Sequence, residues 1–201
     1  MKKKIRKNTV LGLTGGIATG KSLLLGIFKR CGCDIIDSDK IVHRILDRRI
    51  VKSRIVKAFG SNSLNKQKKI NRKALGNLVF NDKKKLKILE NIIHPEVLCV
   101  IKKTIKSQKN KIIIADVPLL YEKKWENYFD QIVLAWCPKD IQIKRLQDRN
   151  KITYMEALKR IRLQGTLSIK KMKAKYVVNT DKKKKFVEKQ VKLILSKCQG
   201  D

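Results

Sequence analysis

The chain has 201 residues, of which 50 are Lys or Arg and 17 are Asp or Glu, so its formal net charge is +33. This length suits one domain with a sizeable core, and a hydrophobic content of 42% excludes a disordered polycation. The basic charge alone could indicate nucleic-acid binding. However, lysines occur in nearly every segment, and only 5% of the residues are aromatic, too few for a base-stacking platform. We therefore expect solvated lysine-rich faces and no specific nucleic-acid partner.

The cysteines and the apolar segments bear on the compartment. The five cysteines are odd in number and have no C-x-x-C spacing, which favours reduced thiols over a zinc site or a disulfide framework. No apolar run approaches the roughly 20 residues that a membrane helix needs. The basic start, MKKKIRK, resembles the beginning of a signal peptide, but the apolar stretch after it is short and broken by glycines. These features predict a cytoplasmic protein without a membrane partner.

Five short apolar runs, rich in β-branched residues, alternate with helical patterns. They span residues 9–14, 33–37, 111–116, 131–136 and 175–179. Continuous apolar runs of this length are typical of strands that are buried on both faces of a parallel sheet with helical crossovers. The sequence therefore predicts an α/β fold with a five-stranded parallel sheet flanked by helices.

The long interval between the second and third runs shows only helical patterns. Asn71 and Asp82 are suitable N-caps, and in His94-Pro95 the proline suits the first turn of a helix. We expect residues 45–107 to form a helical insertion on one side of the sheet.

A second helical interval follows the fourth run. In it Thr153 and Glu156 have the spacing of a capping box before an apolar run. We expect residues 139–165 to be helical, and residues 1–201 as a whole to form a single domain that includes this interval and the insertion.

The stretch GLTGGIATGKS, residues 12–22, directly follows the first predicted strand. Gly15, four further residues and Gly20-Lys21-Ser22 match the P-loop pattern in full. Glycines let successive N–H groups turn toward phosphate oxygens, the lysine reaches the β- and γ-phosphates, and the serine offers a hydroxyl to Mg²⁺. The phosphate-binding residues of this nucleoside triphosphate site are expected to be Gly15, Gly16, Ile17, Ala18, Thr19, Gly20, Lys21, Ser22 and Leu23.

Carboxylates follow the second and third predicted strands. Asp37 and Asp39 lie two residues apart, so in extended backbone they would point the same way, and one could accept the proton of an acceptor hydroxyl. The alternative is helix capping, with Ser38 or Asp39 as the N-cap. Asp116 is either an acid that holds magnesium, as in Walker-B motifs, or simply a polar strand end.

In this combination the sequence resembles the dephospho-coenzyme A kinase family. The resemblance runs in order over nearly the whole chain. It rests on LTGGIATGKS at 13–22, Asp37-Ser38-Asp39, Arg44, His94-Pro95, VPLLYE at 117–122, Arg145, Arg149, Arg160-Ile161 and Gln164. Three departures are Ala18-Thr19, in place of the usual Gly-Ser, Leu23, where a hydroxyl residue is common, and VVNTDK at 177–182, in place of a pattern like VIDNSG.

The resemblance implies a P-loop kinase fold and transfer of the γ-phosphate of ATP to the 3′-hydroxyl of the ribose of dephospho-CoA, with Mg²⁺. It implies that Asp39 is the base, and that Lys21, Arg145 and Arg149 act on the phosphates. It also implies that residues 139–165 form a lid and that the insertion 45–107 lies on the substrate side. Metal ligands would be Ser22 and Asp116, and substrate contacts would come from Asp37, Asp39, Arg44, His94, Leu119 and Leu120. Two alternatives stay open: another small P-loop kinase acting on a nucleotide or metabolite, and a basic nucleic-acid-binding ATPase. The oligomeric state is not predicted.

Overall fold

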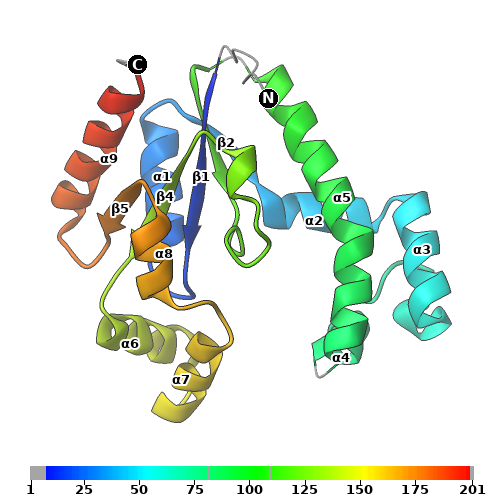
Figure 1. The fold of residues 1–201 in the computed structure, drawn as a ribbon. Helices are drawn as coiled ribbons and strands as arrows, with labels where there is room; N and C mark the ends of the chain where they lie inside the picture. The colour runs from blue at the N-terminus through cyan, green and yellow to red at the C-terminus, as the bar shows by residue number, and fades with distance from the viewer. Residues whose placement is uncertain (1–7, 81, 109, 200–201) are drawn as a thin grey trace. The chain divides into compact units, whose positions relative to one another are not determined.

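The computed structural model describes residues 8–80, 82–108 and 110–199 (Figure 1). The basic segment 1–7 lies outside the described residues. The chain forms two compact units, one made of Met1–Ile36 with Gln108–Asp201 and one made of Asp37–Ser107. The strands are β1 (Thr9–Gly15), β2 (Asp34–Asp37), β3 (Ile112–Asp116), β4 (Gln131–Trp136) and β5 (Tyr176–Asn179). Each begins and ends within one residue of the run that predicts it.

The five strands form one sheet in the order β2-β3-β1-β4-β5, which confirms the predicted α/β fold. The central strand β1 pairs in parallel with β3 and with β4, placing Leu11 opposite Ile114 and Leu13 opposite Val133. β5 pairs in parallel with β4. Because parallel strands end at the same edge, the carboxyl ends of β1 and β3 lie side by side there. The loop after β1 therefore begins close to Asp116.

The two faces of the sheet are covered by different elements. Helices α1 (Lys21–Arg30) and α9 (Lys184–Gln199) lie next to each other in Figure 1 and share one apolar cluster with the sheet. Its members include Leu13, Phe28 and Val187, all fully buried. On the opposite face Gly12 is in close contact with Leu120 and Phe129. Alternate residues of β1 thus face two separate layers, as expected for a strand buried on both sides.

The interval after β4 is helical, as predicted. It contains α6 (Lys139–Asn150), α7 (Tyr154–Arg162) and α8 (Leu167–Lys173). α6 and α7 share a small apolar cluster that includes Leu146 and Ala157. The predicted capping box starts α7: the Thr153 hydroxyl accepts from the Glu156 N–H, and the Glu156 carboxylate accepts from the Thr153 N–H.

The second unit is built from helices α2 (Ser38–Leu46), α3 (Arg49–Phe59), α4 (Arg72–Phe80) and α5 (Lys83–Ser107), with a short 3₁₀ turn, η1 (Ser61–Ser63). Both predicted N-caps are present. The Asn71 side chain accepts from the Ala74 N–H, and the Asp82 carboxylate accepts from the N–H groups of Lys84 and Lys85.

The expected helix start at His94-Pro95 is wrong, because both residues lie inside α5. A proline within a helix removes one backbone hydrogen bond and costs about 3 kcal/mol. Apolar residues on both sides of Pro95, including Ile93, Val97 and Ile101, are buried in the second unit. This continuous buried face keeps the helix intact through the proline.

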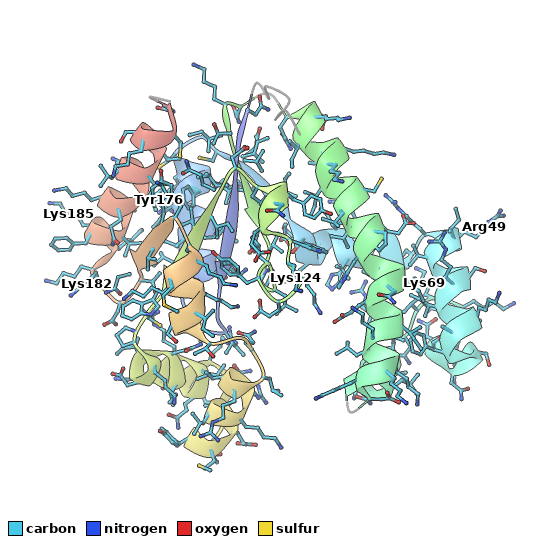
Figure 2. The ribbon with its side chains drawn as sticks, in the orientation of Figure 1. Arg49, Lys69, Lys124, Tyr176, Lys182 and Lys185 are labelled. Atoms are coloured by element: carbon cyan, nitrogen blue, oxygen red, sulfur yellow. The ribbon has the colours of Figure 1, made fainter. Side chains whose placement is uncertain are left out.

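The surface is basic in both units. The runs 83–87 and 182–185 are exposed along their whole length, as predicted for solvated faces. Figure 2 shows Lys182, Lys185 and Arg49 extending away from the ribbon. All five cysteines are free thiols. Among the described residues, no helix has the length and apolar character that a membrane span requires.

The close packing over Gly12 leads to a stability prediction. A Cβ atom on Gly12 would lie 2.7 Å from Leu120 Cδ1 and 2.9 Å from Phe129 Cδ2. We expect Gly12→Ala to lower the free energy of unfolding by about 1–3 kcal/mol, the usual cost of overpacking. The matched control is Gly26→Ala in α1, where the new methyl group meets only the end of Arg30, 3.6 Å away. That variant should gain about 0.5–1 kcal/mol. Denaturant unfolding of both variants measures the difference, and equal shifts would contradict the packing argument.

Candidate active site

The predicted P-loop lies between β1 and α1, with Gly15 at the end of the strand and Lys21 at the start of the helix. The loop turns through two left-handed residues, Ala18 (φ 58°) and Gly20 (φ 81°). The first N–H groups of a helix have no partner inside the helix, and the helix dipole makes this end positive. The turn and the start of α1 therefore present backbone donors where an anion can bind.

Two predicted residues meet at the mouth of this loop. The Lys21 ammonium lies 2.5 Å from Asp116 Oδ1 and donates a hydrogen bond to it. Asp116 is buried at the carboxyl end of β3, whereas Ser22, the next residue after Lys21, is exposed in the first turn of α1. The site thus combines an ammonium, a carboxylate and a hydroxyl beside the backbone donors.

Arg145 reaches the P-loop through a residue that sequence reasoning missed. Its guanidinium donates to the hydroxyl and the carbonyl of Thr180, at 3.1 and 2.8 Å. The buried Thr180 hydroxyl in turn donates to the carbonyl of Thr19, at 2.7 Å. A Cβ atom on Gly20 would lie only 2.8 Å from the Thr180 hydroxyl, so this position needs glycine for space as well as for its positive φ. The sequence feature that could have pointed to Thr180 is the segment VVNTDK at 177–182, which contains it and departs from the family pattern.

Arg149 is placed differently. It is exposed near the end of α6, and its Nε donates to the side chain of Asn150. No hydrogen bond joins Arg149 to the described residues of the P-loop. The structure therefore brings Arg145, but not Arg149, into the hydrogen-bond network around the loop.

The carboxylates of the Asp37-Ser38-Asp39 motif belong to the second unit. Asp37 is the N-cap of α2, where its side chain accepts from the Lys40 N–H at 3.0 Å. The expected N-cap, Ser38 or Asp39, is wrong by one or two positions, because the helix already begins at Ser38. For the same reason Asp39 lies in the first helical turn, and the strand alternation expected for Asp37 and Asp39 does not apply. Asp39 is exposed.

The other predicted substrate residues of this unit lie on two helices that pack together, α2 and α5. Arg44 is exposed in the last turn of α2, and His94 is half-buried in the middle of α5. Leu119 and Leu120 belong to the first unit, in the loop after β3. Leu119 is 39% exposed, while Leu120 is fully buried against Gly12.

The same loop ends at an ion pair. The Glu122 carboxylate lies 2.6 Å from the ammonium of Lys170, a buried lysine of α8. Glu122 also accepts from the N–H of Gly165, at 3.1 Å. Burial alone would raise the pKa of Glu122, but the contacts with Lys170 and with backbone N–H groups outweigh it, and the pKa is lowered. Glu122 therefore holds the segment after α7 as a carboxylate.

This ion pair predicts a pH-dependent stability. Because the folded-state pKa of Glu122 is lowered, its contribution is complete above the unfolded value of about 4.3 and is lost as the pH falls through the lowered pKa. We expect Lys170→Met to lower the free energy of unfolding by about 1–3 kcal/mol at pH 7, because it leaves a partly buried carboxylate without its cation. The difference from wild type should shrink below about pH 4.

The control for this prediction is Lys175→Met, which removes the same charge from an exposed position. Urea unfolding at several pH values gives the comparison. A loss from Lys170→Met that is constant down to pH 3 would show that the ion pair with Glu122 is not its cause.

Comparisons with known proteins place the chain in a family. A sequence model of the dephospho-CoA kinase family matches residues 9–185. The chain is 42% identical to the dephospho-CoA kinase of Lactobacillus johnsonii over 173 residues, which are 84% of this chain and 87% of the relative. It is 35% identical to that of Bacillus licheniformis over 193 residues, 92% of this chain and 94% of the relative.

Solved structures agree. A protein from Thermus thermophilus has a TM-score of 0.84 at 26% identity, covering 96% of this chain and 98% of that one. The dephospho-CoA kinase from Campylobacter jejuni has a TM-score of 0.64 at 28% identity, with the same coverage of both chains. Because the sequence match includes the P-loop and extends over most of the chain, this protein belongs to the dephospho-CoA kinase family.

Proposed function

We propose that the residues described above carry out, in this chain, the reaction of the dephospho-CoA kinases. The chain is an ATP-dependent kinase that transfers the γ-phosphate of ATP to the 3′-hydroxyl of the ribose of dephospho-CoA, giving coenzyme A and ADP. The observation that carries the assignment of the site is the complete P-loop between β1 and α1, with Lys21 and Asp116 paired at its mouth.

The P-loop residues Gly15–Leu23 hold the phosphates of ATP in this proposal. The backbone N–H groups and the positive end of α1 bind phosphate oxygens, and the ammonium of Lys21 stabilises the charge on the β- and γ-phosphates. In the structure this ammonium contacts Asp116. When ATP binds, Lys21 exchanges part of this contact for the phosphates, so Asp116 keeps the ammonium in position before the nucleotide arrives.

The same residues fit a magnesium ion. Mg²⁺ prefers oxygen ligands and is usually held by one or two protein groups together with substrate phosphates. The exposed Ser22 hydroxyl and the Asp116 carboxylate provide such oxygens beside the loop. Ser22 and Asp116 would hold the ion, with Asp116 acting directly or through water. Bound there, Mg²⁺ would neutralise charge on the phosphates.

The acceptor side is assigned to the second unit. Asp39 is the proposed base that orients the 3′-hydroxyl and accepts its proton, and its exposed position in the first turn of α2 leaves it accessible to a substrate. Asp37 supports it by capping the same helix. Arg44, His94 and, from the first unit, Leu119 are the further substrate contacts in this proposal. Leu119 is exposed enough for direct contact, whereas Leu120 is fully buried and acts only by supporting the loop that carries Leu119.

Arg145 and Arg149 complete the proposed catalytic set by stabilising charge on the transferring phosphoryl group. Arg145 is the better placed of the two, because Thr180 already ties it to the P-loop.

We further propose that residues 1–201 work as one kinase domain in the cytoplasm, with residues 45–107 on the substrate side and residues 139–165 as a lid over ATP.

An acceptor screen tests the function. With ATP and Mg²⁺, ADP release should depend on dephospho-CoA and should be far slower with nucleoside monophosphates or pantothenate compounds. Lys21→Ala should nearly abolish turnover, since it removes the ammonium that stabilises phosphate charge. It should also lower the melting temperature, because the buried Asp116 carboxylate loses its contact with this ammonium. Preference for a nucleoside monophosphate would favour the alternative of another small P-loop kinase. Tight nucleic-acid binding at defined stoichiometry, without kinase activity, would favour the nucleic-acid-binding ATPase.

The roles of the two aspartates are separable. Asp39→Asn keeps the shape but loses the proton acceptor, and removal of a general base costs roughly 10²–10⁴-fold in rate. We expect the low end of that range, because phosphoryl transfer has a loose transition state and asparagine still accepts a hydrogen bond. The affinity for ATP should be unchanged.

Asp37 provides the matched controls for this test. Asparagine caps helices as well as aspartate does, so Asp37→Asn should affect turnover less than Asp39→Asn and leave stability intact. Asp37→Ala should cost about 1 kcal/mol of stability. Steady-state kinetics and thermal unfolding are measured on all three variants. If Asp37→Asn abolished turnover while Asp39→Asn did not, the proposed roles would be reversed.

A further inference from the structure

Two glutamines from outside the P-loop bond to both sides of Ile17, one of its residues. The Nε2 group of Gln142 donates to the Ile17 carbonyl at 2.5 Å, and the Ile17 N–H donates to the side-chain oxygen of Gln164 at 2.6 Å. Gln142 lies on α6, and Gln164 lies two residues beyond the end of α7. The backbone of Ile17 is therefore held from two separate elements.

The position of Ile17 gives these bonds their importance. It immediately precedes Ala18, whose positive φ costs roughly 1–2 kcal/mol for a residue with a Cβ atom. The turn at Ala18 leads the chain through Gly20 into α1, whose first N–H groups have no partner inside the helix and can bind phosphate oxygens. A free loop would leave this backbone conformation for a less costly one, and the bonds on either side of Ile17 oppose that change.

Both glutamines are themselves firmly placed. Gln142 is 2% exposed, and a Cβ atom on Gly16 would lie 2.9 Å from its Nε2 group, so the amide packs directly on the loop. Gln164 is followed by Gly165, whose N–H is bound by Glu122, the partner of the buried Lys170. Ile17 and Ala18 also pack their side chains on the apolar cluster between α6 and α7.

We propose that Gln142 and Gln164 are positioning residues that clamp Ile17 and so preset the P-loop for the phosphates of ATP. The inference deepens the proposed function and rests on it, because it assigns the P-loop to ATP. Neither glutamine needs to touch the nucleotide. They act through the loop backbone, which ties its conformation to α6 and to the segment after α7.

The test compares methionine variants, since methionine has the length of glutamine but lacks the amide. Gln164→Met is the main variant, because Gln164 lies outside the helices and is only half-buried. Gln142→Met and the double variant complete a mutant cycle. Gln147→Met is the matched control: Gln147 lies on the same helix as Gln142 but makes no side-chain hydrogen bond to the described residues of the P-loop.

Two measurements are made on each full-length variant. The first is ATP affinity by calorimetry without any acceptor, where Gln164→Met should weaken binding about tenfold. The losses from the two single variants should not add in the double variant, because both bonds restrain the same residue. The second is amide exchange without nucleotide, which should become faster at Ile17 in Gln164→Met but stay slow along β1. The Gln147→Met control should match wild type in both.

The outcomes separate this inference from the proposed function. Wild-type ATP affinity in Gln164→Met would overturn the clamp, whether or not exchange at Ile17 changes. A lower melting temperature with unchanged ATP affinity would show that the glutamines only stabilise the fold, and would overturn it as well. If wild-type protein bound ATP but did not phosphorylate dephospho-CoA, the proposed acceptor would be wrong, whereas the inference about Gln142 and Gln164 would be unaffected.

Discussion

Backbone N–H groups can converge on an anion only where the carbonyl groups of the same turn are satisfied elsewhere. Each peptide unit carries one donor and one acceptor, and an unpaired buried acceptor is costly. In this protein four carbonyls of the loop accept hydrogen bonds, two of them from the loop itself or α1 and two from distant side chains. The Gly16 carbonyl accepts from the Thr19 hydroxyl, and the Ile17 carbonyl accepts from the Gln142 amide. The Thr19 carbonyl accepts from the Thr180 hydroxyl, and the Gly20 carbonyl accepts from the N–H groups of Leu23 and Leu24. The other features of the site depend on this arrangement.

Two of the groups that satisfy these carbonyls come from segments far away in the sequence. Thr180 follows β5, and Gln142 belongs to α6, yet both bond to residues between β1 and α1. Thr180 also receives two hydrogen bonds from Arg145, which fixes the guanidinium beside the loop. A pre-positioned arginine loses little side-chain freedom when charge develops nearby. The support of the loop and the placement of a proposed catalytic cation are therefore the same set of contacts.

Sequence patterns predicted the strands, the P-loop, three of the helix caps and the helical intervals, because each depends on residues that are close together in the chain. The long-range bonds were not predictable in this way. Gln142 looks like an ordinary polar residue of an amphipathic helix, and Thr180 appeared only as a departure from a familiar pattern. Pro95 shows the opposite error: the local signal for a helix start is real, but burial of Ile93 and Val97 on either side of the proline overrides it.

The Asp37-Ser38-Asp39 motif shows how a small shift in a boundary changes an interpretation. Alternation would place Asp37 and Asp39 on one face of a strand, but α2 begins at Ser38 and uses Asp37 as its cap. The two carboxylates then differ in environment, since one is bonded to a backbone N–H and the other lies exposed in the first turn. This difference supports the proposal that Asp37 caps the helix and Asp39 acts as the base, an assignment that the sequence alone left open.

Ala18 is the departure from the family pattern that the structure explains best. A glycine would adopt the left-handed conformation at no steric cost, whereas alanine there costs roughly 1–2 kcal/mol. Its methyl group, however, is partly buried on the cluster between α6 and α7, and full burial of such a group would contribute about 0.8 kcal/mol, so the contact offsets part of this cost. The bonds from Gln142 and Gln164 to the preceding residue supply a further restraint. Alanine is thus compatible with a P-loop here because α6, α7 and the segment after α7 hold the turn from outside.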